Sequence, residues 1–378
     1  MNVLHIISSG GMYGAEAVIL NLSRILNQSG HRSSLGVFAN ARNPNLQLHE
    51  IAQRESVESY LISCKGQIDL SVPRQIRELV RRCSADVVHA HGYKADIYTW
   101  AALRGSRTPF VSTCHTWFDN DHMVKLYGAA DRLVLRNFGH VIAVSEEVRQ
   151  RLLEASVRPE RISLIANGVS LGPFTDAVPS LRSPGDAGTL FIGLVGRLSR
   201  EKGIDIFIEA AEIVLQQFPE VRFFVAGEGP ERPQLEAMIG QRGLGSQVTL
   251  LGRRDDIPSV YASLDILVSA SRQEGLPIAI LEGMASARPI VATSVGEIPL
   301  LIHDGRTGRL VAPGDAQVLA AAISALLTDP AERSRLGAAA REHVVRNFSA
   351  ESMTAEYMRI YEAAVAETLS RAGAGRTR

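Results

Sequence analysis

The sequence predicts an α/β fold made of two doubly wound domains, each with a parallel sheet covered by helices on both faces. Three observations predict it. Short apolar runs of strand length alternate with segments of helical periodicity. The strands are apolar almost throughout, as expected for parallel strands that are buried on both faces. A stretch rich in Pro, Gly, Ser and Asp interrupts the alternation once and divides it into two series.

The first series opens with a strand at residues 3–7 and a helix at residues 15–26, whose apolar side chains recur at helical spacing. Each later strand is an apolar run, and most neighbouring strands are separated by a helical pattern, as in βαβ units. Strands are predicted at residues 35–39, 57–62, 86–90, 110–114, 141–144 and 162–165, with helices that include residues 74–82 and 146–154.

The second series follows the interruption and repeats the same alternation. We expect an N-terminal domain at residues 1–172, a linker at 173–188 and a C-terminal domain at 189–349. An amphipathic helix at about residues 350–370 ends the chain. Strands of the second domain are predicted at residues 190–195, 222–226, 248–251, 264–268, 290–292 and 308–311.

Composition narrows the class of protein. A length of 378 residues is enough for two domains with separate cores. The formal net charge is zero, which argues against bulk attraction to nucleic acid or to an anionic membrane. No apolar run reaches transmembrane length, and the N-terminus lacks the basic start of a signal peptide. The three cysteines lack metal-ligand spacing, so we expect a reduced, cytoplasmic setting.

Four polar, glycine-containing loops follow strands of the second domain. Ligands of doubly wound folds bind beyond the carboxyl ends of the strands, where these loops lie. The first loop, GRLSREKG, begins at Gly196 and carries Arg197 and Lys202, two cations that can neutralise a diphosphate. The next, GEGPER, begins at Gly227, and LGRRDD contains Arg253. One such loop is most often an ordinary turn, but four at one sheet edge indicate a ligand site.

The fourth loop leads into a short apolar helix expected from about Leu276, with Pro277 in its first turn. Unpaired N–H groups at a helix start carry partial positive charge and suit a phosphate or sugar hydroxyls. Glu274 lies just before this helix and Glu282 within it, so the two carboxylates could line one ligand-sized slot. Spacing alone leaves two solvated glutamates equally open.

The first domain contains one glycine loop, SSGGMYGAE, between its first strand and first helix. Met12 replaces the middle glycine of G-x-G-x-x-G, which disfavours a nicotinamide site. Gly10, Gly11 and Gly14 still allow the backbone to pass close to a ligand. The triplet Asp119-Asn120-Asp121 could hold a divalent metal, but it precedes a helix, so we favour helix capping and expect no metal and no cofactor.

Histidines lie near the ends of two strands of the first domain. His89 and His91 share one strand face and could form a metal pair, but no third ligand is apparent, and packing is favoured. His115 follows Cys114 at a strand end. Successive strand side chains point to opposite faces, so the two residues should not form a dyad. We expect Cys114 in the core, whereas His115 is either a hydrogen-bond donor to a substrate or an ordinary loop residue.

The whole pattern resembles the GT-B glycosyltransferases of family 4, which are retaining enzymes that use nucleotide sugars. The similarity covers nearly the whole chain. Its two glutamates, Glu274 and Glu282, have the seven-residue separation that marks the family. The blocks that carry it are VSEEVRQRLL (144–153), ERISLIANGV (160–169), GLVGRLSREKG (193–203), VAGEGPER (225–232) and EGLPIAILEGMASARPIVAT (274–293).

The resemblance implies a GT-B architecture, with two Rossmann-like domains that face each other across a cleft, and it implies roles for single residues. Arg197 and Lys202 would bind the diphosphate of the donor, and His115 would contact the donor sugar. Glu274 would hold the transferred sugar or the distal phosphate, and Glu282 would hold the ribose. The remaining expected donor contacts are Gly11, Gly14, Gly196, Gly227, Arg253, Gly275, Leu276 and Pro277, and the catalytic set is His115, Arg197, Lys202 and Glu274.

The implied function is transfer of a sugar from a UDP- or GDP-sugar to an acceptor hydroxyl with retention, in the synthesis of a bacterial polysaccharide, exopolysaccharide or glycolipid. The acceptor would be a carbohydrate or lipid-linked, with peripheral contact at the inner membrane face left open for residues 122–138. Two alternatives remain. A nucleotide-sugar epimerase of the same fold would convert donor without acceptor, and a non-catalytic nucleotide-sugar-binding protein would bind without turnover.

Overall fold

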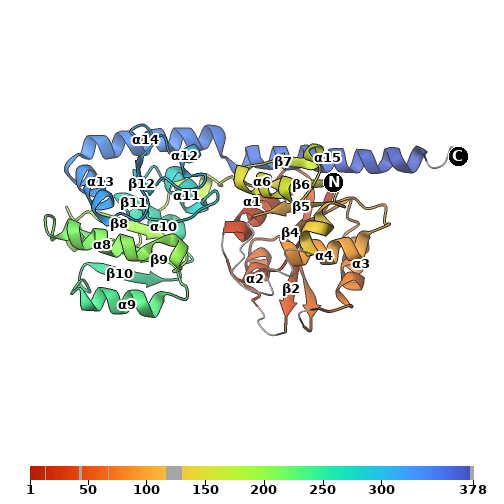
Figure 1. The fold of residues 1–378 in the computed structure, drawn as a ribbon, viewed down its shortest axis with the longest axis horizontal. Coiled ribbons are helices and arrows are strands. Elements are labelled where there is room, and N and C mark those ends of the chain that lie inside the picture. Colours follow the sequence, from red (N-terminus) through yellow and green to blue (C-terminus); the bar gives the residue numbers. More distant parts are fainter. Residues whose placement is uncertain (13, 42–44, 67, 116–129, 375–378) are drawn as a thin grey trace. The chain divides into compact units, whose positions relative to one another are not determined.

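The computed structural model describes residues 1–12, 14–41, 45–66, 68–115 and 130–374. The chain divides into two compact units (Figure 1). The first unit contains residues 1–167 together with 350–378, and the second contains residues 168–349. The C-terminal helix therefore belongs to the first unit, although it follows the second unit in the sequence.

The first unit is built on a seven-stranded parallel sheet with the order β3-β2-β1-β4-β5-β6-β7. The strands are β1 Asn2–Ile7, β2 Arg32–Asn40, β3 Glu58–Cys64, β4 Val87–His91, β5 Phe110–Cys114, β6 His140–Ala143 and β7 Ile162–Leu164. The described helices of this unit are α1 Gly14–Gln28, α2 Gln47–Arg54, α3 Val72–Arg82, α4 Tyr93–Leu103, α6 Glu146–Glu154 and α15 Ala350–Ala374.

The second unit is built on a six-stranded parallel sheet with the order β10-β9-β8-β11-β12-β13. The strands are β8 Phe191–Val195, β9 Arg222–Ala226, β10 Val248–Gly252, β11 Ile266–Ser269, β12 Ile290–Thr293 and β13 Arg309–Val311. The helices are α7 Gly172–Thr175, α8 Ile204–Leu215, α9 Arg232–Gln241, α10 Ile257–Ser263, α11 Ile278–Ala285, α12 Ile298–Leu301, α13 Ala316–Thr328 and α14 Pro330–Asn347.

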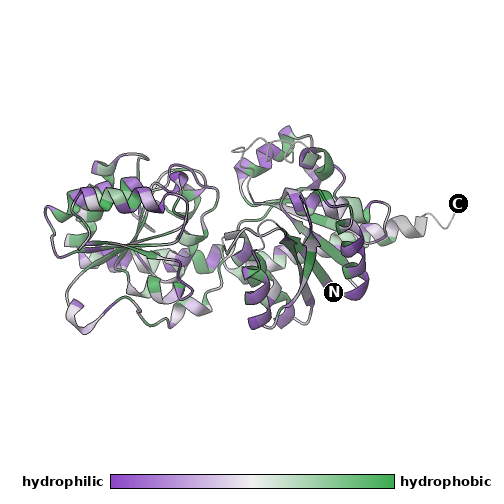
Figure 2. Cartoon of the chain, turned by 90° about the horizontal axis from the view of Figure 1, so that it is seen from below, coloured by the Kyte–Doolittle hydropathy of each residue, from purple (hydrophilic) through white to green (hydrophobic). Residues whose placement is uncertain are grey.

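Both sheets confirm the predicted fold class of two doubly wound parallel sheets. In each, the strand order reverses at one place, between β1 and β4 in the first unit and between β8 and β11 in the second. The loops after these neighbouring strands diverge to opposite faces and leave room for a ligand. Figure 2 shows the hydrophobic strands inside each unit and the polar surfaces of the surrounding helices.

The two faces of the first sheet differ in chemistry. Leu4 and Ile6 point toward the apolar core beneath α3 and α4, together with Val88 and Ala90 of β4. Alternation therefore turns His5, His89 and His91 to the opposite face. On that face α15 contacts α1, β4 and β5.

The segment expected as a linker belongs to the second unit. Backbone N–H groups of Ser180 and Leu181 donate to the Ser263 hydroxyl over 2.9 and 3.0 Å. Arg182 donates to the Ser263 carbonyl over 2.9 Å and forms an ion pair with Asp265. The sequence predicts a linker here because the segment is rich in Pro, Gly and Ser. Composition does not reveal its contacts, which are made with residues far along the chain.

Candidate active site

The strand-end loops of the second unit are packed backbone against backbone at the switch point. Gly203 has φ +62°, and a Cβ there would lie 2.0 Å from the carbonyl oxygen of Ala270. A Cβ on Gly227, with φ +151°, would lie 1.9 Å from the carbonyl oxygen of Gly196. Only glycine allows these approaches. The loops after β8, β9 and β11 are therefore fixed close together.

An ion pair links two of these loops. The ammonium Nζ of Lys202 lies 2.6 Å from Oε1 of Glu274, which also accepts a 2.7 Å hydrogen bond from the Ser271 hydroxyl. The Glu274 side chain is only 9% exposed and that of Lys202 25%. Burial of this kind strengthens the attraction relative to a surface pair. The structure thus brings together two residues that are 72 positions apart in the sequence.

The other predicted cations lie at the same sheet edge, Arg197 on the loop of Lys202 and Arg253 on the loop after β10. Arg197 follows Gly196 directly after β8 and is exposed. Arg253 follows β10, is exposed and pairs with Asp255 over 3.2 Å. Both residues therefore lie at the carboxyl edge of the sheet, where doubly wound folds bind ligands.

The helix α11 begins at Ile278, so the expectation that Pro277 lies in its first turn is wrong. Pro277 is the residue before the helix and has extended backbone angles, φ −75° and ψ 117°. Leu276 is buried beside it. The Gly275 carbonyl accepts a 3.2 Å hydrogen bond from the N–H of Glu297. A proline disfavours helical angles in the preceding residue, which explains why the helix does not start at Leu276, and Pro277 itself takes the extended position just before the helix.

Glu282 lies within α11 and is held by a buried tyrosine. The Tyr261 hydroxyl lies 3.0 Å from Oε2 of Glu282 and 3.0 Å from the Ala279 carbonyl oxygen. Desolvation by the surrounding protein raises the pKa of Glu282 to about 7. A protonated Glu282 can donate to the tyrosine while the tyrosine donates to Ala279, so both hydroxyl protons are used.

The glycine loop of the first unit is fixed by a serine. The hydroxyl of Ser9 lies 2.8 Å from the Gly11 carbonyl oxygen and 2.9 Å from a carboxylate oxygen of Glu16. Gly11 is buried, and Gly14 is the first residue of α1. The structure therefore places both glycines at the carboxyl end of β1, beside the switch point.

Four histidines gather on one face of the first sheet, and His5 is the residue that the sequence did not single out. His5 Nδ1 lies 3.0 Å from His91 Nε2, and His91 Nδ1 lies 3.3 Å from His115 Nε2. His89 instead contacts the Tyr361 hydroxyl over 2.7 Å through Nδ1. His5 is invisible to motif analysis because it lies within an apolar strand and meets β4 only through sheet pairing.

The structure tests the possibility that His89 and His91 bind a metal. His5 supplies the third nitrogen that the sequence lacked, since one nitrogen from each of the three residues lies within 4.8 Å of the others. Both nitrogens of His89 already lie within hydrogen-bond distance of hydroxyls, the second 2.8 Å from Thr113 Oγ1. Hydrogen bonding accounts for this cluster more completely than metal ligation.

Burial keeps the four imidazoles neutral. It lowers the pKa of His5 to about 3 and that of His115 to about 4, and it depresses the pKa values of His89 and His91 well below the usual range. Cys114 is buried, as expected for a core residue, and burial raises the pKa of its thiol. The Asp119–Asp121 triplet lies outside the described residues.

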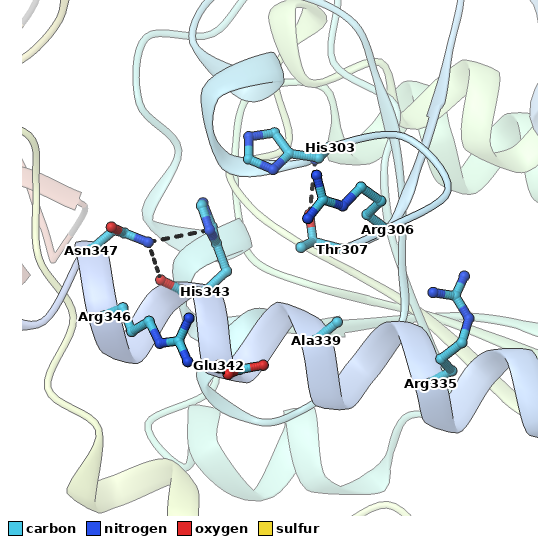
Figure 3. A pocket seen from close by; sticks show the side chains of 9 residues that line it. All are labelled: His303, Arg306, Thr307, Arg335, Ala339, Glu342, His343, Arg346 and Asn347. Atoms are coloured by element: carbon cyan, nitrogen blue, oxygen red, sulfur yellow. Dashed lines mark hydrogen bonds and ion pairs between the residues drawn. The ribbon is translucent and has the colours of Figure 1, made fainter.

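A separate cavity of about 330 Å³ lies in the second unit between α14 and the loop before β13 (Figure 3). This loop enters β13 at its amino end, so the cavity lies at the opposite sheet edge from the residues above. Its walls are basic, and none of the residues predicted to bind the donor contributes to them. The lining residues are His303, Arg306, Thr307, Arg335, Ala339, Glu342, His343, Arg346 and Asn347.

Comparison with known proteins identifies both units. A family model for "Glycosyltransferase Family 4" matches residues 12–172, and one for "Glycosyl transferases group 1" matches residues 189–329. Alpha-D-kanosaminyltransferase of Streptomyces kanamyceticus is 32% identical over 69% of this chain and 72% of the relative. Phosphatidyl-myo-inositol mannosyltransferase of Mycobacterium leprae is 28% identical over 92% of both chains.

Solved structures agree with this assignment at the level of the fold. A crystal structure of HepE from Anabaena in complex with UDP and glucose aligns with a TM-score of 0.82 and 22% identity, and it covers 96% of this chain and 100% of that one. Within the described residues, no helix is both long and apolar enough to span a membrane. The chain belongs to glycosyltransferase family 4, whose C-terminal domain is described as glycosyl transferases group 1, and it is a glycosyltransferase with the GT-B fold.

Proposed function

We propose that the protein transfers a sugar from a nucleoside diphosphate sugar to an acceptor hydroxyl with retention of the anomeric configuration. The observation that carries this proposal is the partly buried Lys202–Glu274 pair, which lies at the switch point with exposed Arg197 on the same loop as Lys202. Such an arrangement offers positive charge to a diphosphate at the place where doubly wound folds bind ligands.

Lys202 has a carboxylate partner in Glu274. Glu274 holds the ammonium in a fixed direction, and a bound diphosphate would take over part of this interaction. Glu274 would then be able to accept hydrogen bonds from the sugar, in keeping with the role that the family resemblance implies. A pre-oriented cation needs little reorganisation when the leaving group gains charge.

The reaction breaks the bond between the anomeric carbon and the diphosphate oxygen, and the electron pair leaves with the diphosphate. The acceptor oxygen forms the new bond on the same face, and its proton passes to the departing diphosphate oxygen. Arg197 and Lys202 stabilise the departing charge, which is the main physical demand of this step. We assign Glu282 to the ribose hydroxyls, where its carboxylate form would accept hydrogen bonds from them.

The remaining predicted contacts complete the donor site. We propose that the backbone of Gly275, Leu276 and Pro277 contacts the sugar end, and that His115 of the first unit contacts the transferred sugar. Gly196, Gly227 and Arg253 lie at the edge where the phosphates and the base would bind. The contacts of Gly11 and Gly14 with the diphosphate stay predictions from the family resemblance.

The acceptor is proposed from the relatives. One relative is named for transfer to phosphatidyl-myo-inositol and another for transfer of kanosamine. We propose a glycolipid or carbohydrate acceptor in a bacterial polysaccharide or glycolipid pathway, and a cytoplasmic protein with peripheral contact at the membrane. The segment considered for this contact, residues 122–138, lies partly outside the described residues.

A donor screen tests the proposal. Melting temperature is measured with UDP-, GDP- and ADP-sugars, and the donor that raises it is then incubated with candidate acceptors. Net stabilisation is expected because a ligand that binds only the native state raises its stability by mass action. NMR of the product should show the donor's anomeric configuration. Conversion of donor without acceptor would identify an epimerase, and binding without any turnover would identify a binding protein.

A further inference from the structure

We propose that a chain of three imidazoles, His5–His91–His115, in which His5 and His91 are buried, positions His115 and sets which of its ring nitrogens carries the proton. The inference rests on the proposed function only in assigning His115 to the donor sugar. The chain runs from the interior of β1 through the end of β4 to the residue after β5, and its two contacts are 3.0 and 3.3 Å long.

The chain has two internally consistent directions. In one, His5 donates from Nδ1 to His91, and His91 donates from Nδ1 to Nε2 of His115. In the other, every proton is on the opposite side, so His115 donates to His91 and His91 donates to His5. Burial keeps the imidazoles neutral, with pKa values of about 3 for His5 and about 4 for His115, so each ring has one N–H and one acceptor nitrogen.

The inner end of the chain selects between these directions. His5 is fully buried, and its Nε2 has no hydrogen-bond partner among the described residues. The second direction would leave an N–H at that position with no acceptor, whereas the first leaves only an unused lone pair. Buried N–H groups without a partner are the rarer and costlier of the two. The first direction is therefore favoured.

This proton arrangement determines which group His115 presents at the end of β5. When Nε2 of His115 accepts from His91, the proton of His115 is on Nδ1, and the ring presents that N–H as its donor. A neutral N–H donor suits a sugar hydroxyl and remains neutral at pH 7. His5 and His91 are thus positioning residues that act through His115, without any contact of their own with substrate.

His89 provides the matched comparison. It lies on the same strand as His91 and is equally buried, but its nitrogens contact the hydroxyls of Tyr361 and Thr113. Tyr361 belongs to α15, so this branch ties the C-terminal helix to the sheet. Substitution of His89 should lower stability and leave the tautomer of His115 unchanged.

The wild-type protein gives the first test. Long-range 15N–1H NMR of the whole chain, labelled with 15N-histidine and assigned with His115→Gln, reports which nitrogen of His115 is protonated. We expect the Nδ1–H tautomer. The Nε2–H form, or an equal mixture, would overturn the proposal. Because no donor is present, this result does not depend on whether the protein transfers a sugar.

Two substitutions at His5 separate a hydrogen-bonding role from packing. His5→Asn retains an N–H near the position of Nδ1 but is small and polar, whereas His5→Leu fills the space and removes the donor. We expect His5→Asn to keep kcat within about two-fold and the Nδ1–H tautomer. His5→Leu should lower kcat about three- to ten-fold, the worth of one net hydrogen bond, and should mix the tautomers.

A packing role predicts the reverse order, because Asn leaves a cavity and an unpaired amide in an apolar strand. Activity of His5→Leu equal to or above that of His5→Asn would therefore contradict the proposal. So would an unchanged His115 tautomer in His5→Leu. If His5→Leu fails to fold, the wild-type spectrum still decides. A protein with the expected tautomer but no transfer from any nucleotide sugar would leave this inference intact and refute the proposed function.

Discussion

The carboxyl edges of the two sheets share one topology and differ in chemistry. The first edge contains buried imidazoles that stay neutral, joined in a hydrogen-bonded chain to His115. The second contains an ion pair, Lys202 with Glu274, and exposed Arg197. A neutral network can orient a donor group but cannot compensate a diphosphate, whereas the cations can. Equal strand order therefore does not imply equal chemistry, because the side chains at the strand ends decide which groups each edge can bind.

The largest expected effect is acid sensitivity of the first unit. Above about pH 6.5, folded and unfolded imidazoles are both neutral, so stability does not depend on them. Below it, the unfolded chain binds protons that the folded unit does not, and stability falls until the folded pKa values are reached, about 4 for His115 and about 3 for His5. The loss is about 1.4 kcal/mol per pH unit for each imidazole.

Urea unfolding followed by tryptophan fluorescence measures this loss. Both tryptophans, Trp100 and Trp117, fall within the first unit's residues, so the signal reports that unit. The midpoint should drop between pH 7.5 and 5.5. An equal midpoint at the two pH values would contradict this expectation.

The next effect concerns the cations of the second unit. Lys202→Ala and Arg197→Ala should each lower kcat about a hundred-fold or more, because each removes a fixed donor to the leaving group, while the fold is retained. The measurement is steady-state transfer with the donor found in the screen. Arg200→Ala is the control, since Arg200 is exposed on the same loop and has no assigned role. Near-normal transfer by either test variant would refute its assignment.

A smaller effect is expected at Glu282. Its pKa of about 7 means that the folded state resists ionisation, so this group's stabilising contribution is present below about pH 4.5 and is lost as the pH rises toward 7. Glu282→Gln, which stays neutral, should be more stable at pH 8 but should bind the nucleoside diphosphate about ten-fold more weakly, since a charged acceptor is lost.

Calorimetric titration and thermal melting test the two effects together. Glu236→Gln, a substitution at a mostly exposed residue, should change neither the nucleotide affinity nor the stability at pH 8. Unaltered nucleotide affinity in Glu282→Gln would remove Glu282 from the ribose site.

The smallest expected effect is the difference between two tyrosine substitutions where the imidazole face meets α15. Tyr361→Phe removes the partner of His89 Nδ1 and should destabilise the first unit by about 1–3 kcal/mol, the usual cost of an unsatisfied buried group. Tyr357→Phe should cost less, because its hydroxyl is 3.2 Å from Thr113, which also contacts His89. Urea midpoints for the two variants measure the difference. Equal losses of stability in the two variants would contradict the larger contribution expected from the Tyr361–His89 contact.

The two edges also differ in how far the sequence predicts them. Arg197, Lys202 and Glu274 stand in loops between clear strands, and parallel pairing brings all such loops to one edge. Their ion pair itself was not predictable, because it depends on side-chain directions within two loops. His5 was missed because periodicity assigns it to a strand but not to a neighbour, and its partner His91 on the adjacent strand β4 is 86 positions away in the sequence.

The strand pattern was recoverable because apolar runs and helical periodicity are local. The boundary near residue 168 was not, because Arg182 and Ser180 make their contacts with residues more than 80 positions away. The start of α11 was placed two residues early, because a proline fits both the first turn of a helix and the position before it.

The most direct test of the central claim is a structure of the protein with a bound nucleotide sugar. We expect diphosphate oxygens within about 3 Å of the Lys202 ammonium and the Arg197 guanidinium, the distance of a charge-assisted hydrogen bond. Phosphates bound instead in the basic cavity beside Arg306, with Lys202 still paired only with Glu274, would contradict the account.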